Sequence, residues 1–422
     1  MKLKIKKNWV VTILLIIILA ICAETKFSFH GSVQKIVMSS VALYGFLLYI
    51  IFNDKRKIER KVFNSLFEAW MPFGFAALYT IVLVQFENQY NLPIAKHAVT
   101  TSIYAFVQMM FAFTLLLKYK NRAIDIVFYY ISFSYCITMF LSLKEASISE
   151  LILNYNSIYN LLERNDVGTA VVPIILLYLY KVFYFNEKNK TNIIRILVCF
   201  IILILCGKRS AIVSIAMGIV ILLITTFHLK NKVRIFNIIN IITILILFTY
   251  VIIIQTGLLT FICIKFGIST EGRIYVWNWF QDMYSISPMY LGKGLQFIHE
   301  YMQAHIAEGG AAISMVSNFD FLHNSNLQVY IELGFFGFFM WFSYFLYILP
   351  RKIKKRFGAD VFYLASIILI SMVYLFMTDN VMTYPVYQST TYICIFSIVF
   401  YNEKKLRGEN RNAENFDSCS CL

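Results

Sequence analysis

The sequence predicts an all-α, polytopic membrane protein, a transmembrane bundle of about twelve spans with one long extracytoplasmic loop that carries short helices. Of its 422 residues, 59% are hydrophobic and only 14% are charged. The apolar residues form long continuous blocks instead of amphipathic stripes. A helix needs about 20 mostly apolar residues to cross the hydrocarbon core, and a bilayer admits only segments whose backbone groups are satisfied internally. The blocks therefore indicate transmembrane helices.

The expected spans follow from these blocks. They lie near residues 9–23, 35–52, 69–86, 99–117, 124–143, 167–185, 193–206, 211–227, 235–255, 327–349, 361–378 and 384–400. The first block has the shape of a signal peptide, but its sequence fits a cleavage site poorly, so we expect an uncleaved span. We expect one membrane domain over residues 1–402, an extracytoplasmic loop at about 256–326, and a disordered cytoplasmic tail at 403–422.

The distribution of basic residues predicts the orientation. With a cytoplasmic N-terminus, 28 of the 38 Lys and Arg residues fall on the inside and 10 on the outside. This bias follows the positive-inside rule, so both termini are expected in the cytoplasm and the long loop outside the cytoplasmic membrane. The net charge of +15 is thus explained by topology, and nucleic acid is not an expected partner.

Three features on the outer side carry chemistry. The first is the turn "CGKRSA" at 206–211, which contains Lys208 and Arg209 and in which Ser210 is a candidate cap for the next helix. The turn places two cations beside a helix N-terminus, where backbone N–H groups and the helix dipole favour an anion. The alternative is a pair of side chains that extend to lipid head groups.

The second feature is "STEGRIYVWNWF" at 269–280. Ser269 or Thr270 is a candidate helix cap, Arg273 falls in the first turn, and Trp277 lies four residues later on the same face. The guanidinium group can bind two phosphate oxygens at once, and the indole can stack on that group or on a sugar ring. The alternative is an interfacial Arg within an aromatic belt.

The third feature is His323. Asn324, Gln328 and Glu332 follow it at four-residue steps along the helix that enters the bilayer. A polar stripe on a spanning helix implies a water-filled cavity or polar partners, and a neutral imidazole there can take a proton from a hydroxyl group. The alternative is simple helix capping. Glu271 and Asp320 in the same loop remain candidates for the base.

The remaining outer histidines are expected to be solvated surface residues. They are His30, His97, His299 and His305. The last two also lack the i, i+4 spacing of a metal-binding pair on one helix. The cysteines show no metal-ligand spacing. We therefore expect no metal and no cofactor.

Two separated arginines and one histidine thus fall on one side of the membrane. A metal-free glycosyl transfer from a lipid diphosphate needs these groups, because cations stabilise the leaving group and a base activates the nucleophile. The segments "GKRSA", "EGRIYVW" and "HNSNLQVYIELGFFG", spread over about 207–339, resemble the O-antigen polymerase and O-antigen ligase superfamily, which includes the Wzy-type polymerases.

This resemblance implies a metal-independent inverting glycosyltransferase that acts on undecaprenyl-diphosphate-linked saccharides at the outer face. Arg209 and Arg273 would contact the diphosphate, and His323 would activate the acceptor hydroxyl. Lys208 stands where many relatives have a small residue. The expected substrate-binding residues are Lys208, Trp277, Asn324, Gln328 and Glu271.

The resemblance leaves two reactions open. A polymerase joins lipid-linked repeat units into an O-antigen or capsule, whereas a ligase moves the glycan to lipid A core or another acceptor. Polymerase is favoured because the chain diverges from the family outside the motifs, and a chain-length regulator and a flippase are then expected partners. A flippase or other transporter is the competing class, but the chain lacks the internal repeat and the paired broken helices typical of transporters.

Overall fold

The computed structural model describes residues 7–23, 30–51, 57–87, 93–145, 162, 164–187, 189–227, 230–268, 270, 272–307, 322–379 and 388–403. These residues form helices and connecting turns, with no strand among them. The long helices are α1 (Lys7–Cys22), α2 (His30–Ile51), α3 (Lys57–Glu87), α4 (Ile94–Tyr119), α5 (Ala123–Glu145), α8 (Asn165–Phe183), α9 (Lys190–Leu205), α10 (Arg209–Thr226), α11 (Lys232–Gln255), α15 (Ser325–Ser343), α17 (Ala359–Phe376) and the helix at residues 388–403.

Shorter helices complete the described part of the chain. Three α-helices lie between α11 and α15, namely α12 (Leu258–Phe266), α13 (Arg273–Trp279) and α14 (Phe297–Ala307). Single 3-10 turns lie at Gln281–Met283, after α13, and at Lys120–Arg122, between α4 and α5. A π-helical turn at Tyr344–Ile348 joins α15 to α16 (Leu349–Phe357), so the part of α15 that follows Gly334 continues as a helix into the basic segment. The predicted long loop with short helices is therefore confirmed.

Each of the twelve predicted spans falls on a helix. Within the described residues, eight helical stretches are long and apolar enough to cross a membrane, and one of these, Ile94–Ser142, covers α4 and most of α5. The helices α1 and α9 are 16 residues each and fall below that length. The all-α polytopic bundle is thus confirmed, while the number of spans stays a prediction.

Helix α3 begins earlier than expected. The sequence places the span at 69–86, but the helix starts at Lys57 and takes in much of the predicted basic loop. Its added turns make specific contacts, because Arg356 of α16 binds both carboxylate oxygens of Glu68, at 2.7 and 2.6 Å, and also donates to Ser65. Charged residues beyond the bilayer continue a helix where they find such partners.

The outward faces of the peripheral helices are apolar. On α11, for example, exposed side chains include Ile238, Ile241, Ile242, Leu245 and Ile246. Apolar bands of this size would be a liability in water, but they suit the hydrocarbon core of a bilayer. Together with the spanning stretches, they identify a multi-pass membrane protein.

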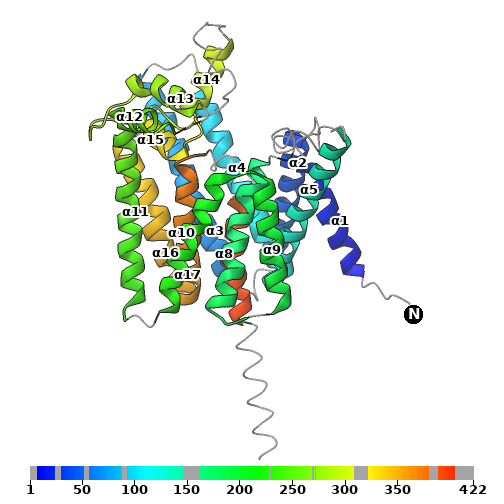
Figure 1. The fold of residues 1–422 in the computed structure, drawn as a ribbon. Helices are drawn as coiled ribbons and strands as arrows, with labels where there is room; N and C mark the ends of the chain where they lie inside the picture. Colours follow the sequence, from blue (N-terminus) through cyan, green and yellow to red (C-terminus); the bar gives the residue numbers. More distant parts are fainter. Residues whose placement is uncertain are drawn as a thin grey trace, which may run out of the picture.

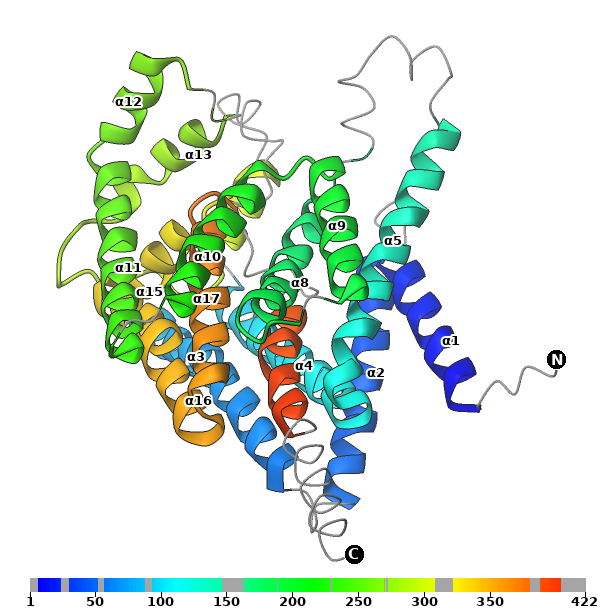
Figure 2. The ribbon, with the colours of Figure 1, turned by 60° about the horizontal axis from the view of Figure 1, so that its bottom comes forward.

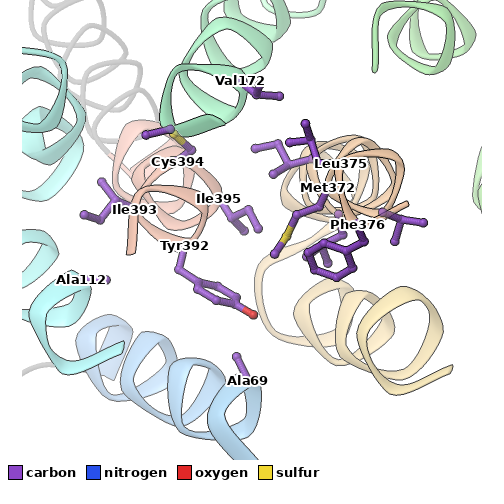
Figure 3. Packing of buried hydrophobic residues seen from close by; sticks show 14 of the residues in the cluster. Ala69, Ala112, Val172, Met372, Leu375, Phe376, Tyr392, Ile393, Cys394 and Ile395 are labelled. Atoms are coloured by element: carbon purple, nitrogen blue, oxygen red, sulfur yellow. The ribbon is translucent and has the colours of Figure 1, made fainter. Parts of the chain in front are cut away.

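The centre of the bundle is formed by helices that are apolar all round. Helix α17 is the most buried of the spanning stretches, and α8 follows it. In Figure 3, Tyr392, Ile393 and Ile395 of the last helix point in different directions, toward neighbours that include α17 and α3. A helix without a polar face is stable only when it is surrounded. The last helix is therefore part of the buried core of the bundle.

The bundle has two distinct ends, visible in Figures 1 and 2. One end carries α12, α13 and α14, and we call it the loop face. The junctions between α8 and α9, α10 and α11, and α16 and α17 lie at the opposite end, where the basic segments gather. The last helix also ends on this opposite side.

Candidate active site

Asp379 joins two predicted site residues that lie far apart in the sequence. It follows the end of α17, and its side chain is 1% exposed. One carboxylate oxygen forms an ion pair with Lys208 Nζ, and the other lies 3.6 Å from Nδ1 of His323. The Lys208 side chain is 7% exposed, whereas that of His323 is 28% exposed. The carboxylate thus neutralises a buried ammonium group and faces an imidazole that solvent can reach.

The backbone at His323 is held in an unusual conformation. Its φ angle is 49°, in the left-handed region that non-glycine residues enter only when their surroundings stabilise it. The preceding carbonyl group, that of Leu322, accepts a hydrogen bond of 2.8 Å from the Trp277 indole N–H. Trp277 is therefore a positioning residue. Its side chain is 4% exposed, which leaves little of its ring surface for stacking on a sugar, so that expected role stays a prediction.

The residues after His323 start α15 and attach it to α17. The Asn324 side-chain oxygen accepts from the Leu327 N–H at 2.9 Å, which makes Asn324 the N-cap of the helix. Ser325 donates to the Asp379 carbonyl oxygen through its N–H at 3.1 Å and its Oγ at 2.9 Å. These bonds fix Asp379 relative to His323. Capping, which the sequence offered as the alternative for this stretch, therefore operates beside the proposed chemistry.

Lys208 lies in the tight turn between α9 and α10. It occupies the N-cap position of α10, so Ser210 lies inside the helix and is not its cap. The first turn of α8 approaches closely, because a Cβ added at Gly168 would lie 2.9 Å from Lys208 Cβ. Only glycine admits this approach, and the aliphatic part of the Lys208 side chain packs against α8 as a result. The ammonium group is thereby directed to Asp379.

Arg209, the next residue, is exposed at the start of α10. Its environment differs from that of Arg164, another arginine toward the loop face. The Arg164 guanidinium group is 3% exposed and binds both carboxylate oxygens of Asp166, at 2.8 and 2.7 Å. Arg164 is therefore committed to the protein, whereas Arg209 is accessible to an anion.

Arg273 is the first residue of α13, a helix that contacts α11. Its N-cap is Gly272, with φ of 83°, and Thr270 accepts only through its backbone carbonyl, so the predicted side-chain cap by Thr270 is wrong. Arg273 interacts electrostatically with Tyr250. The Tyr250 hydroxyl in turn donates to the Met377 carbonyl oxygen at 3.0 Å, two residues before Asp379.

The polar stripe on α15 has protein partners. Glu332 is 1% exposed, and its Oε1 accepts from Gln328 Nε2 at 3.1 Å and from the Ile298 N–H at 3.3 Å. Gln328 is 7% exposed. Of the two expectations for this stripe, polar partners are confirmed. The stripe links α15 to the start of α14.

One comparison with known protein families bears on this site. Residues 194–342 match the O-antigen ligase family. This O-antigen ligase region contains Lys208, Arg209, Arg273 and His323, and it confirms the resemblance to the polymerase and ligase superfamily. It supports a glycosyl-transfer role in making a polysaccharide. No curated protein sequence matches the chain.

Asp379 lies beyond the O-antigen ligase region and was missed by sequence reasoning. The available signal was an acidic residue at the end of a predicted span, in "FMTDN". Charged groups near the bilayer need a partner, which makes such a residue a candidate. The identity of its partners, however, depends on helix packing.

The structure joins only some of the predicted residues of the O-antigen ligase region. Lys208 and His323 meet through Asp379, while Trp277 and Asn324 hold the backbone on either side of His323. Arg209 follows Lys208 in the chain, and Arg273 interacts with Tyr250, whose hydroxyl binds the Met377 carbonyl oxygen. Glu271 and Asp320 lie outside the described residues, so their expected roles stay predictions. The arrangement presents an accessible imidazole with a buried carboxylate behind it, and Arg209 is exposed next to the lysine that binds this carboxylate.

Proposed function

We propose that the protein polymerises undecaprenyl-diphosphate-linked oligosaccharide repeat units into a surface polysaccharide, by metal-independent inverting glycosyl transfer. The observation that carries the proposal is the accessible His323 imidazole facing the buried Asp379 carboxylate. A carboxylate on one side of an imidazole orients the ring and stabilises the cation formed when the ring takes a proton. That is the environment of a general base.

The proposed step balances as follows. An acceptor sugar hydroxyl attacks the anomeric carbon of the donor sugar, from the side opposite the diphosphate. The bond between that carbon and the diphosphate oxygen breaks, and the leaving undecaprenyl diphosphate keeps the electron pair. The hydroxyl proton passes to His323. The configuration at the anomeric carbon therefore inverts.

The arginines supply charge to the leaving group. Arg209 is exposed at the N-terminus of α10, where backbone N–H groups add to its attraction for an anion. Arg273 interacts with Tyr250, whose hydroxyl donates to the carbonyl oxygen of Met377, two residues before Asp379. Guanidinium groups placed where negative charge develops lower the barrier of a transfer reaction. We assign both side chains to the diphosphate.

Lys208 has a different role in this scheme. Its ammonium group is paired with Asp379 and buried, so it is not available for a phosphate. We assign it to holding the Asp379 carboxylate in place behind His323. The substrate-binding role that the sequence predicted for Lys208 is thereby replaced by positioning.

Polymerisation is favoured over ligation because the family match is confined to residues 194–342 of the 422-residue chain. The rest of the chain is then free to recognise a particular repeat unit, which serves as both donor and acceptor. The proposal places the loop face outside the cytoplasmic membrane and both termini in the cytoplasm. A flippase would supply the substrate, and a chain-length regulator would act on the product.

The test uses purified protein in lipid nanodiscs with a lipid-linked repeat unit as the only substrate. We expect a ladder of extended chains without any ion gradient. His323→Ala should lower the rate by at least about 100-fold, because it removes the base. Arg209→Ala and Arg273→Ala should each weaken donor use, and Lys at these positions should restore only part of it, because Lys lacks the planar fork.

The matched control is His305→Ala, which removes another imidazole from the same loop and should leave the ladder intact. Normal chains from the His323→Ala protein would eliminate His323 as the base. Transfer only when lipid A core is supplied would replace polymerisation by ligation, and movement of substrate across vesicles without extension would favour a transporter. Loss of turnover per folded molecule on adding a chelator would contradict the metal-independent scheme.

A further inference from the structure

A second group of ligating side chains lies on the loop face, apart from the His323 site. His97 belongs to α4, and His299 and Glu300 belong to α14. Each offers one ligand atom, and these three atoms lie within 4.8 Å of one another. The sequence suggested solvated histidines here, because histidines in outer loops are mostly surface residues. The folded chain brings them together from two helices.

The three side chains already interact. Nδ1 of His97 forms an ion pair with Oε1 of Glu300, and the rings of His97 and His299 stack with centroids 6.3 Å apart. The Glu300 side chain is 7% exposed and that of His97 is 39% exposed. A carboxylate is costly to bury without a cation, and an ion pair with one imidazole would suffice. The ion pair explains the position of His97, but it does not explain why a second imidazole, that of His299, lies beside the same carboxylate.

The surrounding contacts hold α14 firmly at this position. The Leu295 N–H donates to Thr80 Oγ1 of α3 at 2.8 Å, and the Ile298 N–H donates to Glu332 of α15. A Cβ at Gly294 would lie 2.8 Å from the methyl carbon of Thr80, so the chain passes close against α3. The start of α14 is therefore fixed between two spanning helices. Its His299 and Glu300 face α4 from a preorganised backbone.

We propose that His97, His299 and Glu300 bind one Zn²⁺ ion, which fastens α14 to α4. Two imidazoles and one carboxylate form a common set of protein ligands for zinc, with a fourth position left to water. Bonds near 2.1 Å place neighbouring ligand atoms about 3.4 Å apart, so the present spacing needs only small side-chain rotations. The ion would replace the proton between His97 and Glu300 and would also take up His299.

The site has a structural role. It ties the loop that carries α12, α13 and α14 to the first half of the bundle, and it lies beside the Ile298–Glu332 contact that leads to α15. Because a preformed site binds metal only in the folded protein, metal binding adds to folding stability. The ion touches none of the residues assigned to glycosyl transfer. The proposal is therefore independent of the proposed function.

The test measures zinc in the full-length protein, purified in detergent with an affinity tag that contains no histidine. After chelation and reloading with Zn²⁺, the wild type should hold about one ion per chain and unfold at a higher temperature than the stripped protein. His97→Ala and Glu300→Gln should each bind less than about a tenth of that zinc and should lose the stabilisation. Cobalt in place of zinc should give the visible absorption of a tetrahedral site only in the wild type.

His305→Ala is the matched control, since it removes a histidine from the same helix α14 without touching the three ligands. It should keep both the zinc and the stabilisation. Size-exclusion profiles of the stripped proteins establish that each variant is folded. Zinc bound equally by the wild type and the His97→Ala and Glu300→Gln variants, no zinc in the wild type, or zinc binding without stabilisation would each overturn the proposal.

Discussion

At the scale of single residues, the site depends on the buried Asp379 carboxylate, which lies between Lys208 and His323. Asp379 holds Lys208 by an ion pair and faces His323, and each of the three comes from a different part of the chain. Removing one member of a buried pair is costly because the other charge stays in a poorly solvated place. The same carboxylate thus contributes to stability and to the proposed base.

We therefore predict that Lys208→Met lowers the free energy of unfolding by about 3–5 kcal/mol, since it leaves the Asp379 carboxylate without its ammonium partner. The double variant Lys208→Met/Asp379→Leu should recover part of the loss, because it removes the orphaned charge as well. Thermal unfolding of the purified protein in detergent measures both. Lys265→Met, at an exposed lysine of α12, is the control and should change stability by no more than about 0.5 kcal/mol. Equal stability of the single and double variants would contradict the ion pair.

At the scale of elements, α15 is broken where the loop enters it. Gly334 has φ of 72° and ψ of −172°, which interrupts the helical hydrogen bonds. Loop segment 290–294 supplies replacement hydrogen bonds. The Ile331 carbonyl oxygen accepts from the Lys293 N–H and the Tyr290 hydroxyl, and the Glu332 carbonyl oxygen accepts from the Gly294 N–H. The Phe335 N–H donates to the Tyr290 carbonyl oxygen. Non-helical backbone is tolerated at such depth only where protein satisfies it. The break therefore anchors the loop that carries Arg273 to the helix that follows His323.

We predict that Gly334→Ala destabilises the protein strongly. A Cβ there would lie 2.3 Å from the Leu291 carbonyl carbon, and backbone on that side has no room to move. The cost combines about 1–3 kcal/mol of overpacking with about 1–3 kcal/mol for a backbone conformation that essentially only glycine adopts. The melting temperature and the proposed activity should both fall.

The matched control is Gly257→Ala, at a glycine with φ of 71° where an added Cβ meets no described heavy atom within 4 Å. It should carry only the conformational cost of about 1 kcal/mol. Similar losses in the two variants would mean that the close contact with Leu291 does not matter.

At the scale of the whole molecule, the loop face and the basic segments lie at opposite ends of the bundle. We predict that a membrane-impermeant thiol reagent labels Asp282→Cys, an exposed position between α13 and α14, in intact spheroplasts. Lys190→Cys, exposed at the start of α9, should react only after the membrane is opened. Both substitutions are made in a protein whose eight native cysteines are replaced by alanine. The reverse labelling pattern would invert the topology and place the candidate site in the cytoplasm.

The sequence by itself determined the helical segments and the approximate place of the long loop. The reason is local: continuous apolar blocks must become helices in a bilayer, and basic residues mark the ends that stay inside. The same reading selected Arg209, Arg273 and His323, because an unusual charge or imidazole near a membrane can be recognised from its neighbours alone. It also predicted that the polar stripe of Gln328 and Glu332 would face either a water-filled cavity or polar partners.

Only the tertiary structure decided which groups meet. Asp379 became a site residue because α17 ends beside the start of α15, and His97 joined His299 and Glu300 because α14 packs against α4. Trp277 became a buried hydrogen-bond donor for the same reason. Contacts between distant segments depend on how whole helices pack, and hydropathy along one chain carries no record of which faces will touch.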